Sequence, residues 1–282
     1  MTVHDLHCHS TASDGTLSPG ALVRHAASVG VDVLALTDHD TTAGIAEAGR
    51  EAAVQGLTLL PGVEISVSWR GATVHIVGLR VDPDDHALAT GLARLRAFRD
   101  WRAQEIGRRL AEKGIPGAYE GARARSGGAL IGRTHFARFL VARGYARDTR
   151  EVFRHYLVRG KPGHVAGDWA GLDEAVGWIR NAGGRAVIAH PARYRMTRTR
   201  LRKLIAEFRD AGGEALEVVS GSHSRDEAYT MARHAADFGL LASAGSDYHG
   251  PENPWVEMGR LADLPPGCRP VWHDWSLVTG TA

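Results

Sequence analysis

The sequence predicts an α/β fold, either a βα barrel or a doubly wound sheet. Three observations support this prediction: short apolar, β-branched runs recur along the chain, several of them precede a helical pattern, and 282 residues are enough for one large core. The expected strands are residues 3–7, 31–37, 57–62, 73–79, 185–189, 215–219 and 240–244. A chain of this length holds one α/β domain, or one such domain with an insertion.

Two helices between these strands are predicted from their end signals. One covers residues 19–28, because Ser18 is a suitable N-cap and Pro19 takes the first helical position. The other covers residues 172–181 and stops before a pair of glycines. Both fit the alternation of strand and helix that the fold prediction requires.

Residues 85–163 break this alternation with Arg- and Ala-rich helical sequence. The longest helix there is predicted to be amphipathic and to end near Gly114. Its apolar face consists of Leu92, Leu95, Phe98, Ile106 and Leu110. We therefore expect a main domain built from residues 1–84 and 164–282, with residues 85–163 as a helical insertion beside it. The tail from Asn253 is rich in Pro and Trp and is expected to wrap irregularly over the body.

Composition narrows the function classes without choosing one. No segment approaches the unbroken apolar length of a membrane span, and the first residues lack the basic and apolar regions of a secretion signal. The two cysteines, Cys8 and Cys268, do not make a disulfide framework, so we expect a cytoplasmic protein without membrane attachment. A net charge of +2 permits a polyanionic substrate but does not predict nucleic-acid binding. No feature indicates an obligate protein partner.

Histidine is the unusual residue, with 15 in the chain, and it gathers with carboxylates near the predicted strand ends. In the run DLHCHS, His7 and His9 are two residues apart and therefore share one face of a strand. Similar positions hold Asp14, His39, Glu64, His75, His190, Asp247 and His249. Strand ends meet at one mouth in βα folds, and burying so many ionisable groups separately is costly. The pattern predicts a site for more than one metal ion, and ligands without thiolate favour Zn²⁺, Mn²⁺ or Fe.

The chain resembles the PHP (polymerase and histidinol phosphatase) phosphoesterases. The motifs DLHCHSTASDG, LTDHDT, PGVEIS, HIVG, AHP and GSDYH occur in the family's order, and the resemblance runs over nearly the whole chain. Within the family, the segments IGRTHFARFLVARG, LVRGKPGHV and EVVS are most similar to bacterial enzymes that act on 3',5'-nucleotide bisphosphates and RNA. The resemblance implies a distorted (β/α)7, TIM-like barrel with a small helical insertion, in agreement with the predicted strands.

By motif, the resemblance implies a trinuclear metal site. One ion would bind His7, His9, Glu64 and Asp247, a second Asp14, His39 and His249, and a third His75 and His190, with Glu64 as a bridge. Mn is the expected metal, with Fe or Zn as alternatives. One position departs from the family pattern: Thr134 stands where proline is expected, which should relax that loop without removing a ligand.

Clustered divalent cations would supply the chemistry of phosphoester hydrolysis. They lower the pKa of a bound water, hold phosphate oxygens and neutralise charge as phosphorus is attacked. The sequence therefore predicts attack by a metal-bound hydroxide, without a nucleophilic serine or cysteine. Asp247 and Arg133 are expected to take part in the reaction, and His223 is either the proton donor to the leaving oxygen or an ordinary loop residue.

Cationic side chains near the ligand motifs are the candidates for binding the substrate phosphate. They are Arg133, His135, Lys161, Arg193 and Arg195. Arginine offers phosphate a bidentate fork and lysine a point charge. The resemblance favours Arg133, His135 and Arg193, and a solvated basic surface is the alternative for each candidate.

The leading hypothesis is a metal-dependent phosphoesterase that acts on nucleotides. It would remove the 3'-phosphate from nucleoside 3',5'-bisphosphates, for example from pAp to give AMP, and would shorten short 5'-phosphorylated RNA from its 5' end. In both reactions a cationic pocket holds the 5'-phosphate while the ester on the 3' oxygen is cut at the metals. Two alternatives stay open: a small-molecule phosphatase of the histidinol phosphatase type, and a non-catalytic, metal-bound scaffold.

Overall fold

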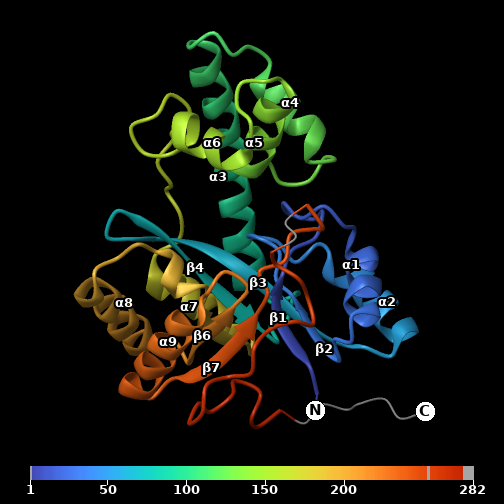
Figure 1. Cartoon of the computed structure of the whole chain (residues 1–282), viewed down its shortest axis with the longest axis vertical. Helices are drawn as coiled ribbons and strands as arrows, with labels where there is room; N and C mark the ends of the chain where they lie inside the picture. The colour runs from blue at the N-terminus through green and yellow to red at the C-terminus, as the bar shows by residue number, and fades with distance from the viewer. Residues whose placement is uncertain (1, 253–254, 276–282) are drawn as a thin grey trace.

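The centre of the molecule is a seven-stranded sheet whose strands lie side by side in sequence order (Figure 1). The computed structural model describes residues 2–252 and 255–275. The strands are β1 (His4–Cys8), β2 (Val33–Leu36), β3 (Thr58–Trp69), β4 (Ala72–Leu79), β5 (Arg185–Ile188), β6 (Ala215–Ser220) and β7 (Leu241–Gly245). The first and last strands come together, because the Asp247 amide donates to the His7 carbonyl at 2.8 Å. The sheet is thus a nearly closed barrel, which confirms the predicted fold and the presence of a strand in each of the seven predicted places.

The barrel is distorted because β4 runs against both of its neighbours. β3 pairs with β4, and β4 with β5, in antiparallel fashion, whereas the other pairs are parallel. A two-residue turn of Arg70 and Gly71 joins β3 to β4, and both residues have positive φ, at 47° and 76°. Such turns match the twist of a hairpin. β3 therefore extends to Trp69, well beyond the predicted end at residue 62.

Helices cover the outside of this barrel (Figure 1). They are α1 (Pro19–Ser28), α2 (Ile45–Gln55), α7 (Leu172–Asn181), α8 (Arg198–Asp210) and α9 (Arg225–Phe238). The bounds predicted for α1 and α7 are confirmed, and the Ser18 side chain accepts from the Ala21 amide at 3.2 Å, as an N-cap does.

A group of helices stands above the barrel mouth (Figure 1). They are α3 (His86–Ala111), α4 (Ala118–Arg125), α5 (Arg133–Ala142) and α6 (Thr149–Val152), with a π-helical turn at Phe153–Leu157 after them. The first half of α3 packs Leu88 and Leu92 into the barrel core, whereas Ile106 and Leu110 pack into a separate core with α4 and α5. Because α3 belongs to both cores, the domain division at residue 85 stays a prediction.

The described part of the tail, residues 255–275, forms neither helix nor strand and runs beside β7. There, Val271 is buried and its amide donates to the Ala242 carbonyl at 2.8 Å. This confirms the predicted irregular path for that part, whereas Asn253 lies outside the described residues. Among the described helices, none is long and apolar enough to cross a membrane.

Candidate metal centre

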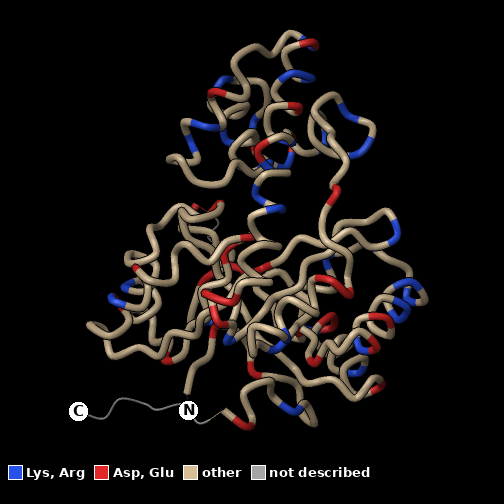
Figure 2. The backbone as a smooth tube through the Cα atoms, turned by 180° about the vertical axis from the view of Figure 1, so that it is seen from behind, with Lys and Arg blue, Asp and Glu red and all other residues tan. Residues whose placement is uncertain are grey.

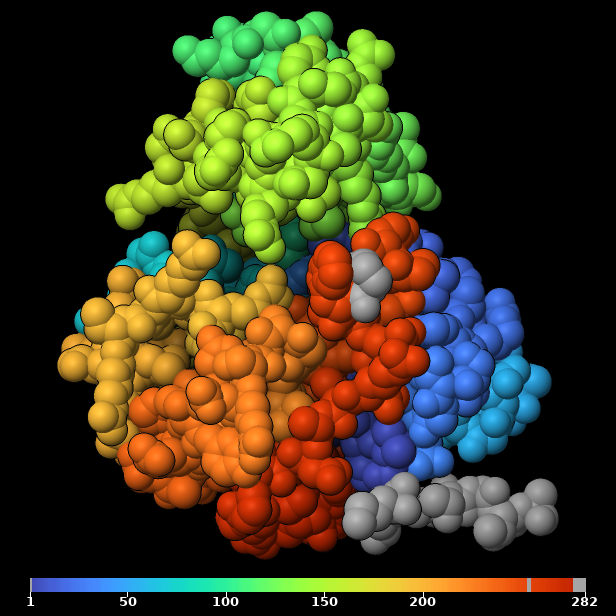
Figure 3. Space-filling view, viewed as in Figure 1, coloured from blue at the N-terminus to red at the C-terminus, as the bar shows by residue number. Residues whose placement is uncertain are grey.

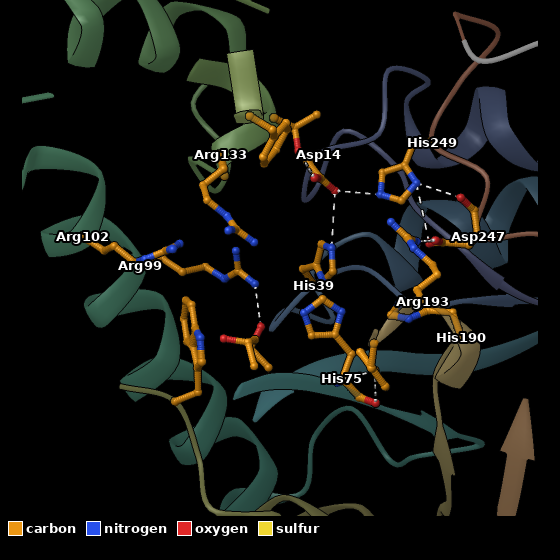
Figure 4. Close-up of a pocket in the computed structure, with 17 residues that line it drawn as sticks. Asp14, His39, His75, Arg99, Arg102, Arg133, His190, Arg193, Asp247 and His249 are labelled. Carbon is orange, nitrogen blue, oxygen red and sulfur yellow. Dashed lines mark hydrogen bonds and ion pairs between the residues drawn. The ribbon is translucent and has the colours of Figure 1, made fainter. Parts of the chain in front are cut away.

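Histidine and carboxylate side chains from several strands and the loops after them converge at one mouth of the barrel, and Figure 4 shows those that line the cavity there. Their donor atoms form four overlapping groups, with the atoms of each group within 4.8 Å of one another. The groups are His9, Asp14, His39 and His249; His7, Glu64 and His190; His7, His9 and Asp247; and His39, Glu64 and His75. These residues are the nine predicted ligands, and together we call them the metal centre.

Glu64 is the hub of the metal centre. Its side chain has no solvent exposure, and imidazole nitrogens approach both of its oxygens. His75 Nδ1 lies 2.9 Å and His190 Nε2 3.0 Å from Oε1, while His39 Nδ1 lies 2.7 Å from Oε2. One carboxylate thus contacts imidazoles from three separate parts of the barrel, as its predicted bridging position requires.

Several buried polar atoms of the metal centre have no hydrogen-bond partner among the described residues. They include Nδ1 of His9 and His39, Oδ1 of Asp14 and Oε2 of Glu64. His39 Nδ1 and Glu64 Oε2 are close, but their approach lacks hydrogen-bond geometry. Leaving such atoms unpaired costs a few kcal/mol each, on the order of 1–3. Imidazole and carboxylate donors in this arrangement fit divalent cations, which would satisfy these atoms together.

The charges of the metal centre favour the metal-binding form of Glu64 and His9 but not that of His249. Burial opposes the charge on Glu64, but the surrounding imidazoles outweigh it and hold its pKa well below the usual value. Burial and the neighbouring imidazoles lower the pKa of His9 to about 3. For His249, burial is outweighed by Asp14 and Asp247, which raise its pKa to about 9. Ionised carboxylates and a neutral His9 are ready ligands, whereas His249 would have to release a proton.

Further groups behind the ligands hold them in place. Glu217 on β6 is buried, and its Oε2 lies 3.1 Å from His7 Nδ1 and accepts from the His190 amide at 2.6 Å. The other ring nitrogen of His7, Nε2, faces Glu64. From α5, the Thr134 hydroxyl donates to Asp14 Oδ2 at 2.7 Å. Such partners fix the tautomer and orientation of a ligand.

Two of the predicted ligands lie on strained backbone. His190 and Asp247 have φ of 29° and 57°, a region that side chains other than glycine rarely adopt. Strain of this kind costs roughly 1–3 kcal/mol per residue and is concentrated at functional sites. This strain lowers the stability of the fold, and it orients the two side chains toward the barrel mouth.

A cavity of about 340 Å³ opens between the metal centre and the helices above it. Figure 2 shows acidic residues gathered at the barrel mouth and basic residues on the helices that face it. On the side opposite the metal centre the cavity is lined by Arg99 and Arg102 of α3 and Arg133 of α5, which we call the arginine wall (Figure 4). The size is within the range of small-ligand sites.

The three members of the arginine wall are not equivalent. Arg99 is neutralised, because its Nε donates to Asp40 at 2.6 Å. Arg102 is 8% exposed, and within residues 2–252 and 255–275 it donates only to the Val165 carbonyl, while Arg133 lies over the Phe153 ring. Among the described residues, neither of these two has a carboxylate partner. Burial and the adjacent guanidinium groups lower the pKa of Arg102 to about 9, so an anion bound here would relieve their repulsion.

The comparisons with known proteins agree with this architecture. A family model described as "PHP domain" matches residues 5–161, more than half of the chain. The chain belongs to the PHP family. A Chromobacterium violaceum protein named 3',5'-nucleoside bisphosphate phosphatase is 52% identical, over 96% of this PHP chain and 95% of that protein. The Escherichia coli (strain K12) protein named 5'-3' exoribonuclease Rnm is 45% identical, over 99% and 96%.

A solved structure is similar to this PHP protein over most of both chains. It is described as an amidohydrolase from Chromobacterium violaceum with bound sulfate and no metal, and it superimposes with a TM-score of 0.91 at 52% identity. The match covers 95% of this chain and 94% of that chain. The barrel and the helices above it are therefore a shared architecture.

The predicted phosphate-binding residues of the PHP chain divide into two sets. Arg133 and Arg193 line the cavity, and the Arg193 guanidinium pairs with Asp247. The structure does not bring the other candidates to the cavity wall. His135 is buried and accepts from the Gly132 amide at 3.0 Å, and Lys161 and Arg195 are exposed.

His223 also lies outside this cavity. Its Nδ1 lies 3.1 Å from the Val218 carbonyl, and its Nε2 lies 3.4 Å from the Ala192 amide, in the short η2 turn (Pro191–Arg193). The donor role of His223 stays a prediction.

Sequence reasoning missed Arg99, Arg102 and Glu217. The two arginines are three residues apart on a helix and so share one face, a signal that was present in the sequence. It was hidden because an arginine on an amphipathic helix usually belongs to its solvated side. Glu217 lies inside an apolar strand, where a lone carboxylate is itself unusual.

Proposed function

We propose that this PHP protein is a metal-dependent phosphoesterase that removes the 3'-phosphate from nucleoside 3',5'-bisphosphates and hydrolyses 5'-phosphorylated RNA from its 5' end. One observation carries the proposal: a single cavity has the metal centre on one side and the arginine wall on the other. A nucleotide with phosphates on both sides of its ribose can contact both. A substrate with one phosphate has no group for the second site.

The names of the relatives support this proposal. One is named for a bisphosphate phosphatase and another for a 5'-3' exoribonuclease. Both activities act on a phosphate that is esterified to the 3' oxygen of a nucleotide. In the bisphosphate that phosphate is terminal, whereas in RNA it also carries the next nucleoside. One site that recognises the 5'-phosphate serves both reactions.

The ligand set supports three divalent ions, with Mn²⁺ as our first choice and Fe²⁺ or Zn²⁺ accepted by the same nitrogen and oxygen donors. Bound ions of this kind lower the pKa of a water molecule and neutralise charge that develops on a phosphoryl group. The chain itself supplies orientation. Glu217 holds His7, Thr134 holds Asp14, and the strained backbone directs His190 and Asp247 inward.

The arginine wall provides the substrate recognition in this proposal. Arg102 and Arg133 offer guanidinium groups without a carboxylate partner in the described structure, and these would bind the 5'-phosphate by charge-assisted hydrogen bonds. Arg193 sits on the metal side, paired with Asp247 and half-exposed, where it would contact the scissile phosphate. The 5'-phosphate thereby positions the 3' ester at the metal centre.

We further infer a cytoplasmic location. Cys8 and Cys268 are both free thiols, and RNA is a substrate of that compartment.

The test compares three substrates with added Mn²⁺: adenosine 3',5'-bisphosphate, a 5'-phosphorylated RNA oligomer and histidinol phosphate. We expect AMP and phosphate from the first, mononucleotides from the second and little turnover of the third. Glu64→Gln is the inactive control, and Glu112→Gln, an exposed change of the same type on the surface beyond α3, is the matched control. Turnover of histidinol phosphate alone would replace the proposal with a small-molecule phosphatase. Metal binding without turnover of any substrate would indicate a scaffold.

A further inference from the structure

A second, larger cavity lies on the same side of the barrel as the metal centre. Its volume is about 760 Å³, and it is enclosed by the end of β6, the start of α9 and residues 255–266. On the face shown in Figure 3, the segment after β7 (red) lies beside the region of β6 and α9 (orange). We call it the exit cavity; the proposed function uses only the cavity between the metal centre and the arginine wall.

Hydrogen bonds connect the lining of the exit cavity to segments that belong to the metal centre. His223, which lines it, lies 3.4 Å from the Ala192 amide, in the turn directly after His190. Gly221, also in its lining, donates its amide to the Gly245 carbonyl at 3.2 Å, two residues before Asp247. Two of the segments that carry predicted metal ligands are therefore hydrogen-bonded to residues that line the exit cavity.

Exposed aromatic rings give this cavity its chemical character. Tyr229 is 46% exposed and Trp255 is 85% exposed, both large for aromatic side chains. The Arg225 guanidinium lies over the Tyr229 ring at 5.8 Å from its centroid. Aromatic rings that remain open to solvent beside an arginine are the usual platforms on which unpaired bases stack.

The direction of the substrate is set by the proposed function, on which this inference rests. The arginine wall holds the 5'-phosphate on one side of the metal centre, and Arg193 and Asp247 lie on the other side (Figure 4). A chain that continues beyond the scissile phosphate must leave on the Arg193 side. Ala192, one residue before Arg193, contacts the wall of the exit cavity.

We propose that the exit cavity binds the nucleotides downstream of the scissile phosphate of a single-stranded RNA. The Tyr229 and Trp255 rings would stack on the bases, while Arg225 contacts the backbone. A 3',5'-bisphosphate has no downstream nucleotide, so the exit cavity serves the RNA reaction alone.

The lining of the exit cavity contains two arginines and two carboxylates. Glu257 is 3.6 Å from Arg260, and the other two are Arg225 and Asp263. Binding at this site would then depend on stacking more than on phosphate neutralisation. Truncation of an aromatic ring should therefore change RNA affinity while leaving its salt dependence nearly unchanged.

The test is the kcat/KM of Trp255→Ala and Tyr229→Ala on two substrates, a 5'-phosphorylated RNA hexamer and adenosine 3',5'-bisphosphate. We expect each variant to lose about tenfold on the RNA, the usual effect of removing one stacking ring, and to stay within about twofold on the bisphosphate. The bisphosphate activity also reports that each variant is folded. Trp101→Ala, which removes an exposed ring of α3 outside both cavities, should change neither rate.

A binding measurement gives an independent readout. In the Glu64→Gln background, an RNA with 2-aminopurine as its second base should show quenched fluorescence on binding, and adding Trp255→Ala should remove most of the quench. Equal loss on both substrates, or no loss on RNA, would overturn the exit-cavity proposal while leaving the phosphatase intact. A wild-type protein that hydrolyses neither substrate would instead overturn the proposed function.

Discussion

The two sides of the main cavity are built by different means. The metal centre is assembled from residues between His7 and His249, which lie on barrel strands or in the loops that follow them. The arginine wall comes from two helices, α3 and α5, that stand above the barrel. In the proposed function the barrel would supply the chemistry, whereas the helices would select which phosphoester reaches it.

The largest effect is expected from removing the hub of the metal centre. Glu64→Gln should lower turnover of every phosphoester by about 10³-fold, because Glu64 touches imidazoles of three of the ligand groups. The bound metal per chain, measured by elemental analysis, should fall as well. Full activity with normal metal content would contradict the role of the metal centre.

The second-largest effect is expected from removing a charge of the arginine wall, on the side of the cavity opposite the metal centre. Arg133→Met should lower kcat/KM for adenosine 3',5'-bisphosphate by roughly 10- to 100-fold, the usual worth of a charge-assisted hydrogen bond, and leave the metal content unchanged. Arg108→Met, an exposed arginine of α3, is the matched control. A loss shared with substrates that lack a 5'-phosphate would show that Arg133 acts on the metal side.

A smaller effect is expected behind the metal centre. Glu217→Gln keeps the shape of the side chain but weakens its hold on His7 Nδ1, so metal affinity should fall by about tenfold or more. Excess metal should restore most of the turnover. Activity that stays low at saturating metal would mean that Glu217 contributes directly to the reaction.

The smallest effect is expected where the helices meet the metal centre. Thr134 is the one α5 residue whose side chain hydrogen-bonds to the side chain of a ligand in the described structure. Thr134→Val should weaken metal affinity by about three- to tenfold, the worth of one hydrogen bond, and Thr134→Ser should restore it. Equal metal affinity in all three proteins would show that this hydrogen bond does not support the metal centre.

The convergence of the nine candidate ligands could be predicted from the sequence, because the ends of strands can be recognised from its pattern. A run such as DLHCHS places two imidazoles on one face, and the strand period fixes where they point. Glu64 and His75 were found for the same reason, each in or after a short apolar run. Ordinary strand rules therefore indicated which side chains would gather at the mouth, whereas the grouping implied by the resemblance differs from the structure, in which His75 and His190 belong to different groups.

The arginine wall could not be predicted in the same way. Arg99 and Arg102 look like the solvated side of an amphipathic helix, and only the position of α3 across the mouth turns them inward. That position depends on packing of Leu88 and Leu92 against the barrel, which is a tertiary property. His135 shows the reverse case, because its place beside Arg133 suggested phosphate, whereas its ring accepts from the Gly132 amide.

In the proposed function, one substrate molecule contacts both the metal centre and the arginine wall. A double cycle tests this bridge by comparing wild type with Arg102→Met on adenosine 3',5'-bisphosphate and on adenosine 3'-monophosphate. We predict that the wild type prefers the bisphosphate by at least about tenfold in kcat/KM, and that the variant loses this preference while its rate on the monophosphate is unchanged. An undiminished preference in the variant would contradict the bridge, because the 5'-phosphate would then bind elsewhere.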